Sequence, residues 1–264
     1  MTTPDAPLIL RHDDDRGVCT LTLNRPAAFN ALSEELLTAL QTELDHLSQN
    51  QKLRVLVIAA AGKAFCAGHD LRQMRAEPSM DYYQKLFSQC GQMMMSIQKL
   101  QVPVIAKVQG IATAAGCQLV AQCDLAVASS EAKFAVSGVN LGLFCATPSV
   151  ALSRNLSRKA AFEMLVTGDF LSAQDALKQG LINQIAEPDQ LDACVEALLV
   201  KILSKPQVAL AMGKELFYMQ LETGIEKAYE YASQTMACNM MDNAALEGVQ
   251  AFIEKRKPNW PSNN

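Results

Sequence analysis

Runs of hydrophobic residues predict a series of strands in the first two-thirds of the chain. Residues 18–24 alternate apolar and polar side chains, which is typical of a half-buried strand, and a shorter run at 8–11 precedes them. Residues 55–60 form a continuous apolar run, as expected of a strand covered on both faces. Residues 104–108 and 125–128 are predicted to be further buried strands.

The segments between these strands have apolar residues at helical spacing. Ser33 is a predicted N-cap, and the leucines between positions 36 and 47 recur on one helical face. Residues 80–100 predict a long helix that Pro103 ends. The alternation of strand, helix and strand predicts an α/β fold with right-handed connections between parallel strands.

The last third of the chain has a different character. A short helix is predicted from Ser172, with Gly180 as its end, and nearly all residues after 189 are predicted to be helical. Pro206 and Gly224 interrupt this helical tail. Because its apolar faces are thin, the tail is predicted to pack on the α/β core or on another subunit. We therefore divide the chain into a core at 1–200 and a helical oligomerisation region at 201–264.

Composition and charge narrow the range of partners. The net charge of −4 over 264 residues gives no general reason to expect nucleic acid or an anionic membrane as partner. The eight cysteines form no CxxC pair, and three histidines complete no zinc set, so no metal site is predicted. The N-terminus lacks a basic or apolar leader, and no apolar run is long enough to span a bilayer. These features predict a cytoplasmic protein.

Two segments of small residues, 65–71 and 110–118, each follow a predicted strand and lead into a helix. The first amides of a helix have no intrahelical acceptor and lie at the positive end of its dipole. Two such ends could bind the oxygen of a thioester carbonyl and stabilise an oxyanion. From the residues alone, close packing of the backbone is the commoner reason for such turns.

Together with these two segments, an ordered set of motifs resembles the crotonase (enoyl-CoA hydratase/isomerase) superfamily. The motifs are Asn24-Arg25-Pro26, Asn30-Ala31-Leu32, Cys123-Asp124-Leu125-Ala126, Phe134, Asn140-Leu141-Gly142, Thr167-Gly168, Gly180-Leu181 and residues 251–256. The resemblance implies a spiral of ββα units followed by a helical trimerisation region, in a homotrimer or a dimer of trimers. It also implies an acyl-CoA thioester as ligand, a lyase of fatty acid metabolism, and no separate cofactor.

The resemblance assigns the oxyanion hole to the amides of His69 and Ala115. It assigns seven further positions to the CoA path, namely Arg25, Ala27, Ala67, Asp70, Leu71, Phe252 and Lys255. The first two would lie near the phosphates, the next three along the adenine and pantetheine, and the last two would approach from the C-terminal helices. For the basic residues at 255–257, a solvated helix end is an equal alternative.

The sequence departs from the family at the two glutamates that hydrate an enoyl thioester. They are replaced by Gln118 and Gly138, which cannot exchange a proton, so standard hydration is expected to be impaired. Restoring glutamates should raise it, although Gly138→Glu is the riskier change because glycine can adopt backbone angles that glutamate cannot. The absence of both glutamates resembles the enoyl-CoA hydratase domain-containing proteins.

Other side chains could supply chemistry. The segment around His69 resembles decarboxylases of malonyl-type CoA esters, but the aromatic hydroxyl of those enzymes is replaced by Cys145. We interpret Cys145 as inert packing rather than as a nucleophile. Asn140 and Gln118 are candidates to orient water or substrate, and Gln118 is expected to line the pocket. The leading hypothesis is an enzyme that polarises a thioester carbonyl, and the rival is a non-catalytic acyl-CoA-binding pseudoenzyme.

Overall fold

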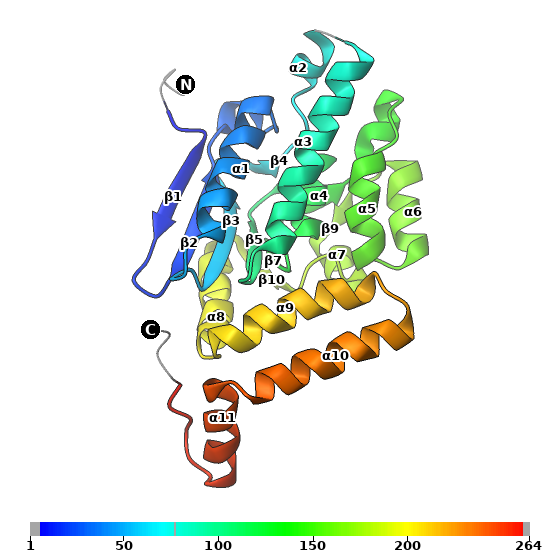
Figure 1. Ribbon diagram of the computed structural model, residues 1–264. Coiled ribbons are helices and arrows are strands. Elements are labelled where there is room, and N and C mark those ends of the chain that lie inside the picture. The colour runs from blue at the N-terminus through cyan, green and yellow to red at the C-terminus, as the bar shows by residue number, and fades with distance from the viewer. Residues whose placement is uncertain (1–5, 77, 261–264) are drawn as a thin grey trace.

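The computed structural model describes residues 6–76 and 78–260, whose strands form two sheets (Figure 1). The larger sheet has the order β1-β2-β3-β5-β7-β10, and the smaller has the order β4-β6-β8-β9. Within these residues the β1–β2 and β8–β9 pairs are antiparallel, and the other pairs are parallel. The strands are β1 (Ile9–Asp13), β2 (Val18–Leu23), β3 (Val55–Ala60), β4 (Ala64–Cys66), β5 (Val104–Val108), β6 (Ile111–Thr113), β7 (Leu125–Ser129), β8 (Lys133–Ala135), β9 (Leu171–Ser172) and β10 (Gln184–Ala186).

One unit recurs three times along the chain. A long strand of the larger sheet is followed by a short strand of the smaller sheet and then by helix, as in β3–β4, β5–β6 and β7–β8. This confirms the spiral of ββα units. The short strands were not predicted from the sequence, because three residues are too few to show alternation.

Helices cover both sheets. They are α1 (Glu34–Ser48), α2 (Leu71–Ala76), α3 (Met80–Lys99), α4 (Ala115–Gln122), α5 (Ala146–Asn155), α6 (Arg158–Thr167), α7 (Ala173–Gln179), α8 (Leu191–Leu203), α9 (Gln207–Leu221), α10 (Ile225–Met240) and α11 (Asn243–Ile253). The predicted caps are present: Ser33 accepts from the Leu36 amide, and Gly180 ends α7 with a φ of 89°. The sequence analysis did not predict α5 and α6.

The core lies on both faces of the larger sheet. On one face Leu56 and Ile58 belong to the same buried cluster as residues of α1 and α3. On the other face Val55 and Val57 pack with residues of α8, including Val195. Burial on both sides explains the continuous apolar run of β3.

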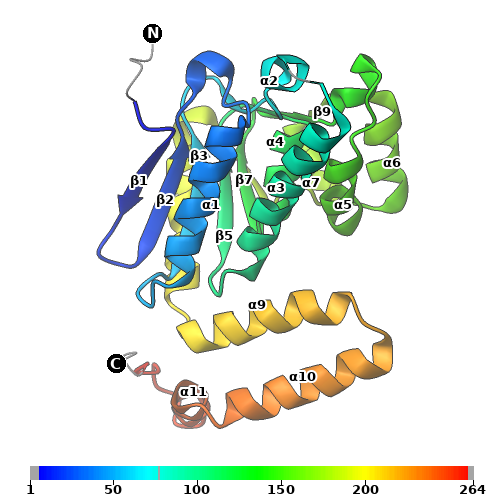
Figure 2. The same ribbon diagram turned by 45° about the horizontal axis from the view of Figure 1, so that its top comes forward.

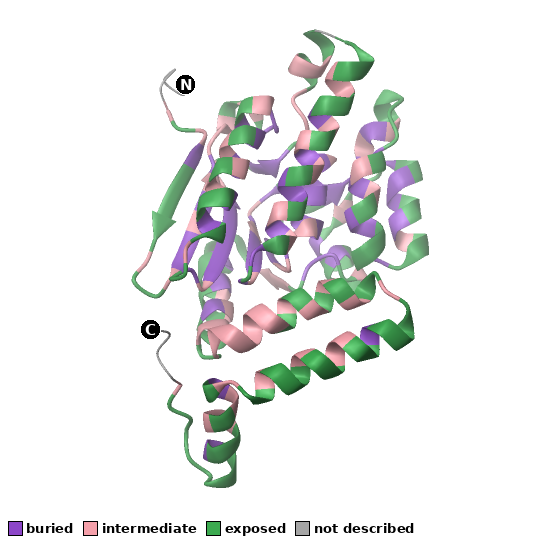
Figure 3. Cartoon of the chain, viewed as in Figure 1, coloured by how far each residue is buried: buried purple, intermediate pink, exposed green. Residues whose placement is uncertain are grey.

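The last three helices form a layer of their own beside the α/β body (Figure 2). Helices α9 and α10 run side by side, and α11 lies beyond them. Most of α10 and α11 is exposed (Figure 3). The predicted boundary after residue 200 falls within α8 and stays a prediction. Of the helices in the described part of the chain, none has the length and apolar character that crossing a bilayer requires.

Candidate active site

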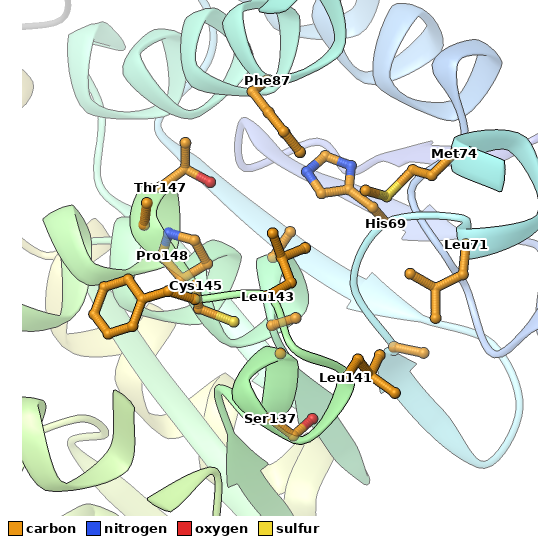
Figure 4. A pocket seen from close by; sticks show the side chains of 16 residues that line it. His69, Leu71, Met74, Phe87, Ser137, Leu141, Leu143, Cys145, Thr147 and Pro148 are labelled. Atoms are coloured by element: carbon orange, nitrogen blue, oxygen red, sulfur yellow. The ribbon is translucent and has the colours of Figure 1, made fainter. Parts of the chain in front are cut away.

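A cavity of about 280 Å³ lies between α2 and α3 on one side and α5 on the other (Figure 4). The N-terminus of α4 and a short 3₁₀ helix, η2 (Ser137–Leu141), form its inner wall. Its lining is mostly apolar. The lining residues are Ala67, His69, Leu71, Met74, Phe87, Ala114, Ala115, Ser137, Gly138, Leu141, Leu143, Phe144, Cys145, Ala146, Thr147 and Pro148.

The two amides expected to form an oxyanion hole both belong to this lining. Ala115 is the first residue of α4, so its N–H has no acceptor within the helix. His69 follows Gly68 in the loop after β4. Neither amide donates a hydrogen bond to any residue in the 6–76 and 78–260 ranges. Two free donors therefore lie beside one apolar cavity.

Close backbone contact holds the two loops together. Gly68 has a φ of 92°, and a Cβ there would lie 2.8 Å from the Ala114 Cβ. The Thr113 hydroxyl donates to the Ala67 carbonyl at 3.0 Å. Ala114 itself has a φ of 49°, which is unusual for a residue with a side chain and turns the chain into α4. The small residues of both segments are thus needed for this contact.

The His69 side chain forms part of the pocket wall. Its ring packs edge-on against Phe87 with 5.4 Å between the ring centroids. Both ring nitrogens are buried, no side chain in the described part of the chain bonds to them, and the Leu32 backbone acts on the ring as a hydrogen-bond partner that opposes the effect of burial. Burial lowers the pKa of His69 to about 4, so the imidazole is neutral at physiological pH.

The two positions of the family glutamates differ in their surroundings. Gln118 is only 4% exposed, and its Oε1 has no hydrogen-bond partner in the described chain. It is buried in α4 and, contrary to expectation, is not among the residues that line the cavity. Gly138 does line the pocket, and a Cβ there would lie 2.5 Å from the Leu143 carbonyl oxygen and 2.7 Å from the Cys145 Sγ.

Of the candidate residues Asn140 and Cys145, only Cys145 lines the cavity. The Asn140 amide donates to the Gly168 carbonyl at 3.4 Å, and this residue is not part of the lining, so the expected role in orienting substrate is not supported. Cys145 lines the pocket and is buried. Burial raises the pKa of its thiol, which keeps the sulfur protonated, in agreement with the interpretation as packing.

The residues expected near CoA are only partly brought together. Ala67 and Leu71 line the pocket mouth, whereas Ala27 is exposed in the turn before α1. Arg25 is held by the Asp70 carboxylate at 3.0 Å and also donates to the Ala31 carbonyl. The arginine expected near the phosphates is therefore already paired. Burial alone would raise the pKa of Asp70, but hydrogen bonds from Arg25 and from backbone amides outweigh it and lower the pKa.

Phe252 and Lys255 do not reach the pocket of their own chain. Phe252 is 85% exposed near the end of α11, and neither residue lines the cavity. In Figures 1 and 2, α11 lies beyond α9 and α10, away from the elements that form the pocket. Their predicted approach to CoA stays a prediction.

Sequence reasoning missed the polar lining residues Ser137 and Thr147. Ser137 is the direct neighbour of Gly138, and that position could have indicated it. Thr147 lies in the first turn of α5, a helix that was not predicted. No sequence motif marks it.

Comparison with known proteins agrees with the family resemblance that the sequence motifs indicate. The family model described as "Enoyl-CoA hydratase/isomerase" matches residues 13–263. The mouse protein named "Enoyl-CoA hydratase domain-containing protein 3, mitochondrial" is 45% identical over 92% of this chain and 81% of its own. Because that name includes "mitochondrial", it lends no support to the predicted cytoplasmic location, which stays a prediction.

Two crystal structures are similar over almost their whole length. An enoyl-CoA hydratase of Mycobacterium smegmatis has 63% identity and a TM-score of 0.96, covering 97% of this chain and 99% of its own. Human enoyl coenzyme A hydratase domain-containing protein 3 has 42% identity and a TM-score of 0.92, covering 96% of this chain and 100% of its own.

Proposed function

Because this chain belongs to the enoyl-CoA hydratase/isomerase family, we propose that it binds an acyl-CoA thioester and polarises the thioester carbonyl. The carbonyl oxygen would accept hydrogen bonds from the amides of His69 and Ala115. The observation that carries this proposal is the pair of amides without acceptors at the wall of one apolar cavity. Fixed N–H donors stabilise the negative charge that develops on such an oxygen.

Hydration by two glutamates is not the reaction we propose. No aspartate or glutamate is among the described residues that line the cavity. Gln118 cannot take a proton, and Gly138 has no side chain. A general acid or base contributes roughly 10²- to 10⁴-fold, so we expect crotonyl-CoA hydration far below the enzyme median of roughly 10 s⁻¹.

We propose that carbonyl-directed chemistry is retained and that His69 is the group able to exchange a proton. As a neutral imidazole, it has one nitrogen that can accept a proton and one that can donate. The rival is a pseudoenzyme that binds acyl-CoA and does not turn it over. The replacement of both glutamates favours this rival. Mass analysis of a panel of enoyl-, malonyl- and acyl-CoA esters after incubation distinguishes the two.

The hole itself can be tested with proline, which removes a backbone N–H. Ala115 is the first residue of its helix, where proline is common, but Ala114 before it has a φ of 49° and a ψ of −120°, outside the extended region that usually precedes proline, so the fold of the variant must be checked. Ala115→Pro is expected to weaken binding of butyryl-CoA, measured by calorimetry. Ala173→Pro is the matched control, because Ala173 is the first residue of α7 outside the cavity. Circular dichroism checks that both variants fold. Unchanged affinity in a folded Ala115→Pro protein would contradict the proposal.

A further inference from the structure

A second cavity, of about 650 Å³, lies at the end of β3 that is remote from the proposed oxyanion hole (Figure 1). Its wall combines the turn between β1 and β2, the segment before β3, the junction of α8 and α9, and the C-terminal tail. The lining residues of this polar cavity are Asp14, Asp15, Arg16, Gly17, Gln51, Lys52, Arg54, Leu203, Lys205, Pro206, Gln207 and Trp260. In the described part of the chain it shares no lining residue with the apolar cavity.

Positive charge is in excess around the polar cavity. Arg16 is neutralised, because it pairs with Asp14 at 2.8 Å and also with Glu196. Among the described residues, three further lining cations form no ion pair, namely Lys52, Arg54 and Lys205. Asp15 is the remaining acidic residue of the lining, so these unpaired groups carry a net charge of +2. This excess lies on a chain whose overall charge is −4.

The guanidinium of Arg54 is held in a fixed orientation. Its Nη2 donates to the Lys205 carbonyl at 2.8 Å and to the Leu203 carbonyl at 3.4 Å. Its Nε is buried and has no hydrogen-bond partner in the described ranges. The two carbonyls orient the cation but do not neutralise it. A partly buried cation without a countercharge favours an anionic ligand.

The N-terminus of α9 adds to the positive potential. Pro206, the N-cap, and Gln207, the first helical residue, both line the polar cavity. No side chain caps this end of the 15-residue helix, and its first turn contains no acidic residue. The positive end of the helix dipole is therefore not compensated within α9, which is the arrangement that attracts phosphate groups.

An aromatic ring forms another part of the wall. The Trp260 Nε1 donates to the Ser204 carbonyl at 3.0 Å, which fixes the indole beside the junction of α8 and α9. An indole face can stack on a nucleobase. The cavity volume is also within the range of roughly 300–1,000 Å³ that is usual for small-molecule sites. Size, charge and ring together suit a phosphorylated small molecule.

We propose that the polar cavity binds a phosphate group, either as free inorganic phosphate or as part of a nucleotide whose base lies against Trp260. Its oxygens would accept hydrogen bonds from Lys52, Arg54 and Lys205, and its two negative charges would match the excess of positive charge. The ligand would thereby connect the start of β3 to the junction of α8 and α9. This site does not depend on the proposed function, since the thioester would bind at the other end of β3.

The test is calorimetric titration of the intact chain with sodium phosphate and with ADP, at an ionic strength held constant with sodium chloride. We expect saturable binding and a change in the emission of Trp260, which is the only tryptophan in the sequence. Tighter binding of ADP than of phosphate would identify a nucleotide as the source of the phosphate group, and equal affinity would identify the free anion.

Variants locate the bound anion. Lys52→Gln and Lys205→Gln should each weaken phosphate or ADP binding about three- to tenfold, which is what one hydrogen bond contributes, and should leave butyryl-CoA affinity unchanged. Lys52→Arg keeps the charge and should keep the binding. Lys178→Gln is the matched control, because Lys178 is an exposed lysine of α7 outside both cavities.

Three results would overturn this inference. The first is no saturable binding of either probe at millimolar concentration. The second is binding that Lys52→Gln and Lys205→Gln leave unchanged, or that Lys178→Gln weakens equally, because the anion would then lie elsewhere or respond only to overall charge. The third is an equal loss of butyryl-CoA affinity in the two variants, which would mean that the sites are not separate. Wild-type binding of butyryl-CoA tests the proposed function independently of the first two results.

Discussion

At the scale of single residues, Gly138 shows how little room there is for the glutamate that the family resemblance expects at this position. The expected obstacle was a backbone angle reserved for glycine, and this was wrong, because Gly138 is not among the residues with positive φ. The obstacle is space, since the Leu143 carbonyl and the Cys145 sulfur fill the volume that a Cβ would need. A glutamate at this position must first displace the backbone of the 143–145 turn.

Gly138→Ala is therefore predicted to lower the free energy of unfolding by about 1–3 kcal/mol through overpacking. Gly91→Ala is the control, because Gly91 lies inside α3 with no atom within 4 Å of an added Cβ. That change should stabilise the protein by about 0.5–1 kcal/mol. Denaturant unfolding of the two variants measures both effects. If Gly138→Ala changed the free energy of unfolding by the same amount and in the same direction as Gly91→Ala, the atoms around Gly138 would be able to make room for a Cβ, and the prediction would be wrong.

His69 is predicted to make stability depend on pH. Its folded pKa of about 4 lies below the unfolded value of 6.5, so the unfolded chain binds the proton more readily. The contribution of the neutral His69 to the free energy of unfolding is present above pH 6.5. It is lost progressively as the pH falls from 6.5 toward 4. Between pH 7 and pH 5 the loss should be about 2 kcal/mol. His69→Gln should lose this part of the pH dependence in thermal unfolding. An identical slope in both proteins would contradict a buried, neutral His69.

Residues that line the cavity could be predicted where their place depends on the backbone. Small residues after buried strands marked the two segments that touch, and the family resemblance assigned His69 and Ala115 within them. Side-chain direction could not be predicted. Asn140 turns to Gly168 because of its place in η2, and Thr147 enters the pocket through a helix with no strong periodic signal. Both depend on how distant segments pack.

At the scale of elements, a buried ionic cluster anchors α9 to the α/β body. The Asp124 carboxylate accepts from the Lys214 ammonium at 2.6 Å and from the Tyr218 hydroxyl at 2.6 Å. It also accepts from the Val104 amide at 2.6 Å. Lys214 is 8% exposed and donates to two backbone carbonyls as well. A single carboxylate thus joins strand β5 to a helix more than 80 residues away in sequence.

Lys214→Met is predicted to lower the free energy of unfolding by about 3 kcal/mol, because it leaves a buried carboxylate without its cation. Arg154→Met is the matched control. Arg154 pairs with Glu222, the residue that follows α9, and both side chains are more than half exposed, at 54% and 57%. Its loss should cost less than about 1 kcal/mol. Urea unfolding compares the two variants, and equal losses would mean that the buried cluster does not anchor the helix.

Elements differed in how well the sequence predicted them. The long strands and the helices α1 and α3 have apolar faces that repeat several times, so their pattern is clear. In α5 and α6, few residues are buried, and their apolar spacing is correspondingly weak. The smaller sheet depends on pairing between short segments that become neighbours only after the spiral forms.

At the scale of the whole molecule, the C-terminal helices present large apolar side chains to solvent. Phe217, Ile225, Tyr229, Met241 and Phe252 are between 55% and 85% exposed. Exposed apolar surface of this extent marks an interaction site. We expect a second copy to cover it, consistent with the predicted homotrimer or dimer of trimers.

Light scattering at micromolar concentration should therefore give a mass of three or six chains. Ile225→Glu, at a residue 73% exposed on α10, should shift the mass toward the monomer. Lys85→Glu on the exposed side of α3 reverses a charge away from these helices and should leave the mass unchanged. A monomeric mass for the unmodified protein would refute the prediction.

Main-chain N–H groups survive every substitution except one to proline. As long as the small residues that bring the two loops together are kept, substitutions at positions 69 and 115 other than to proline leave the two N–H groups of the proposed hole in place. A catalytic side chain, by contrast, is removed by almost any substitution at its position. Binding of the thioester would therefore depend on the backbone, whereas the reaction that follows would depend on side chains, and the two can change independently. A lineage can exchange one reaction for another, or abandon turnover, without passing through an ancestor that no longer recognises its thioester.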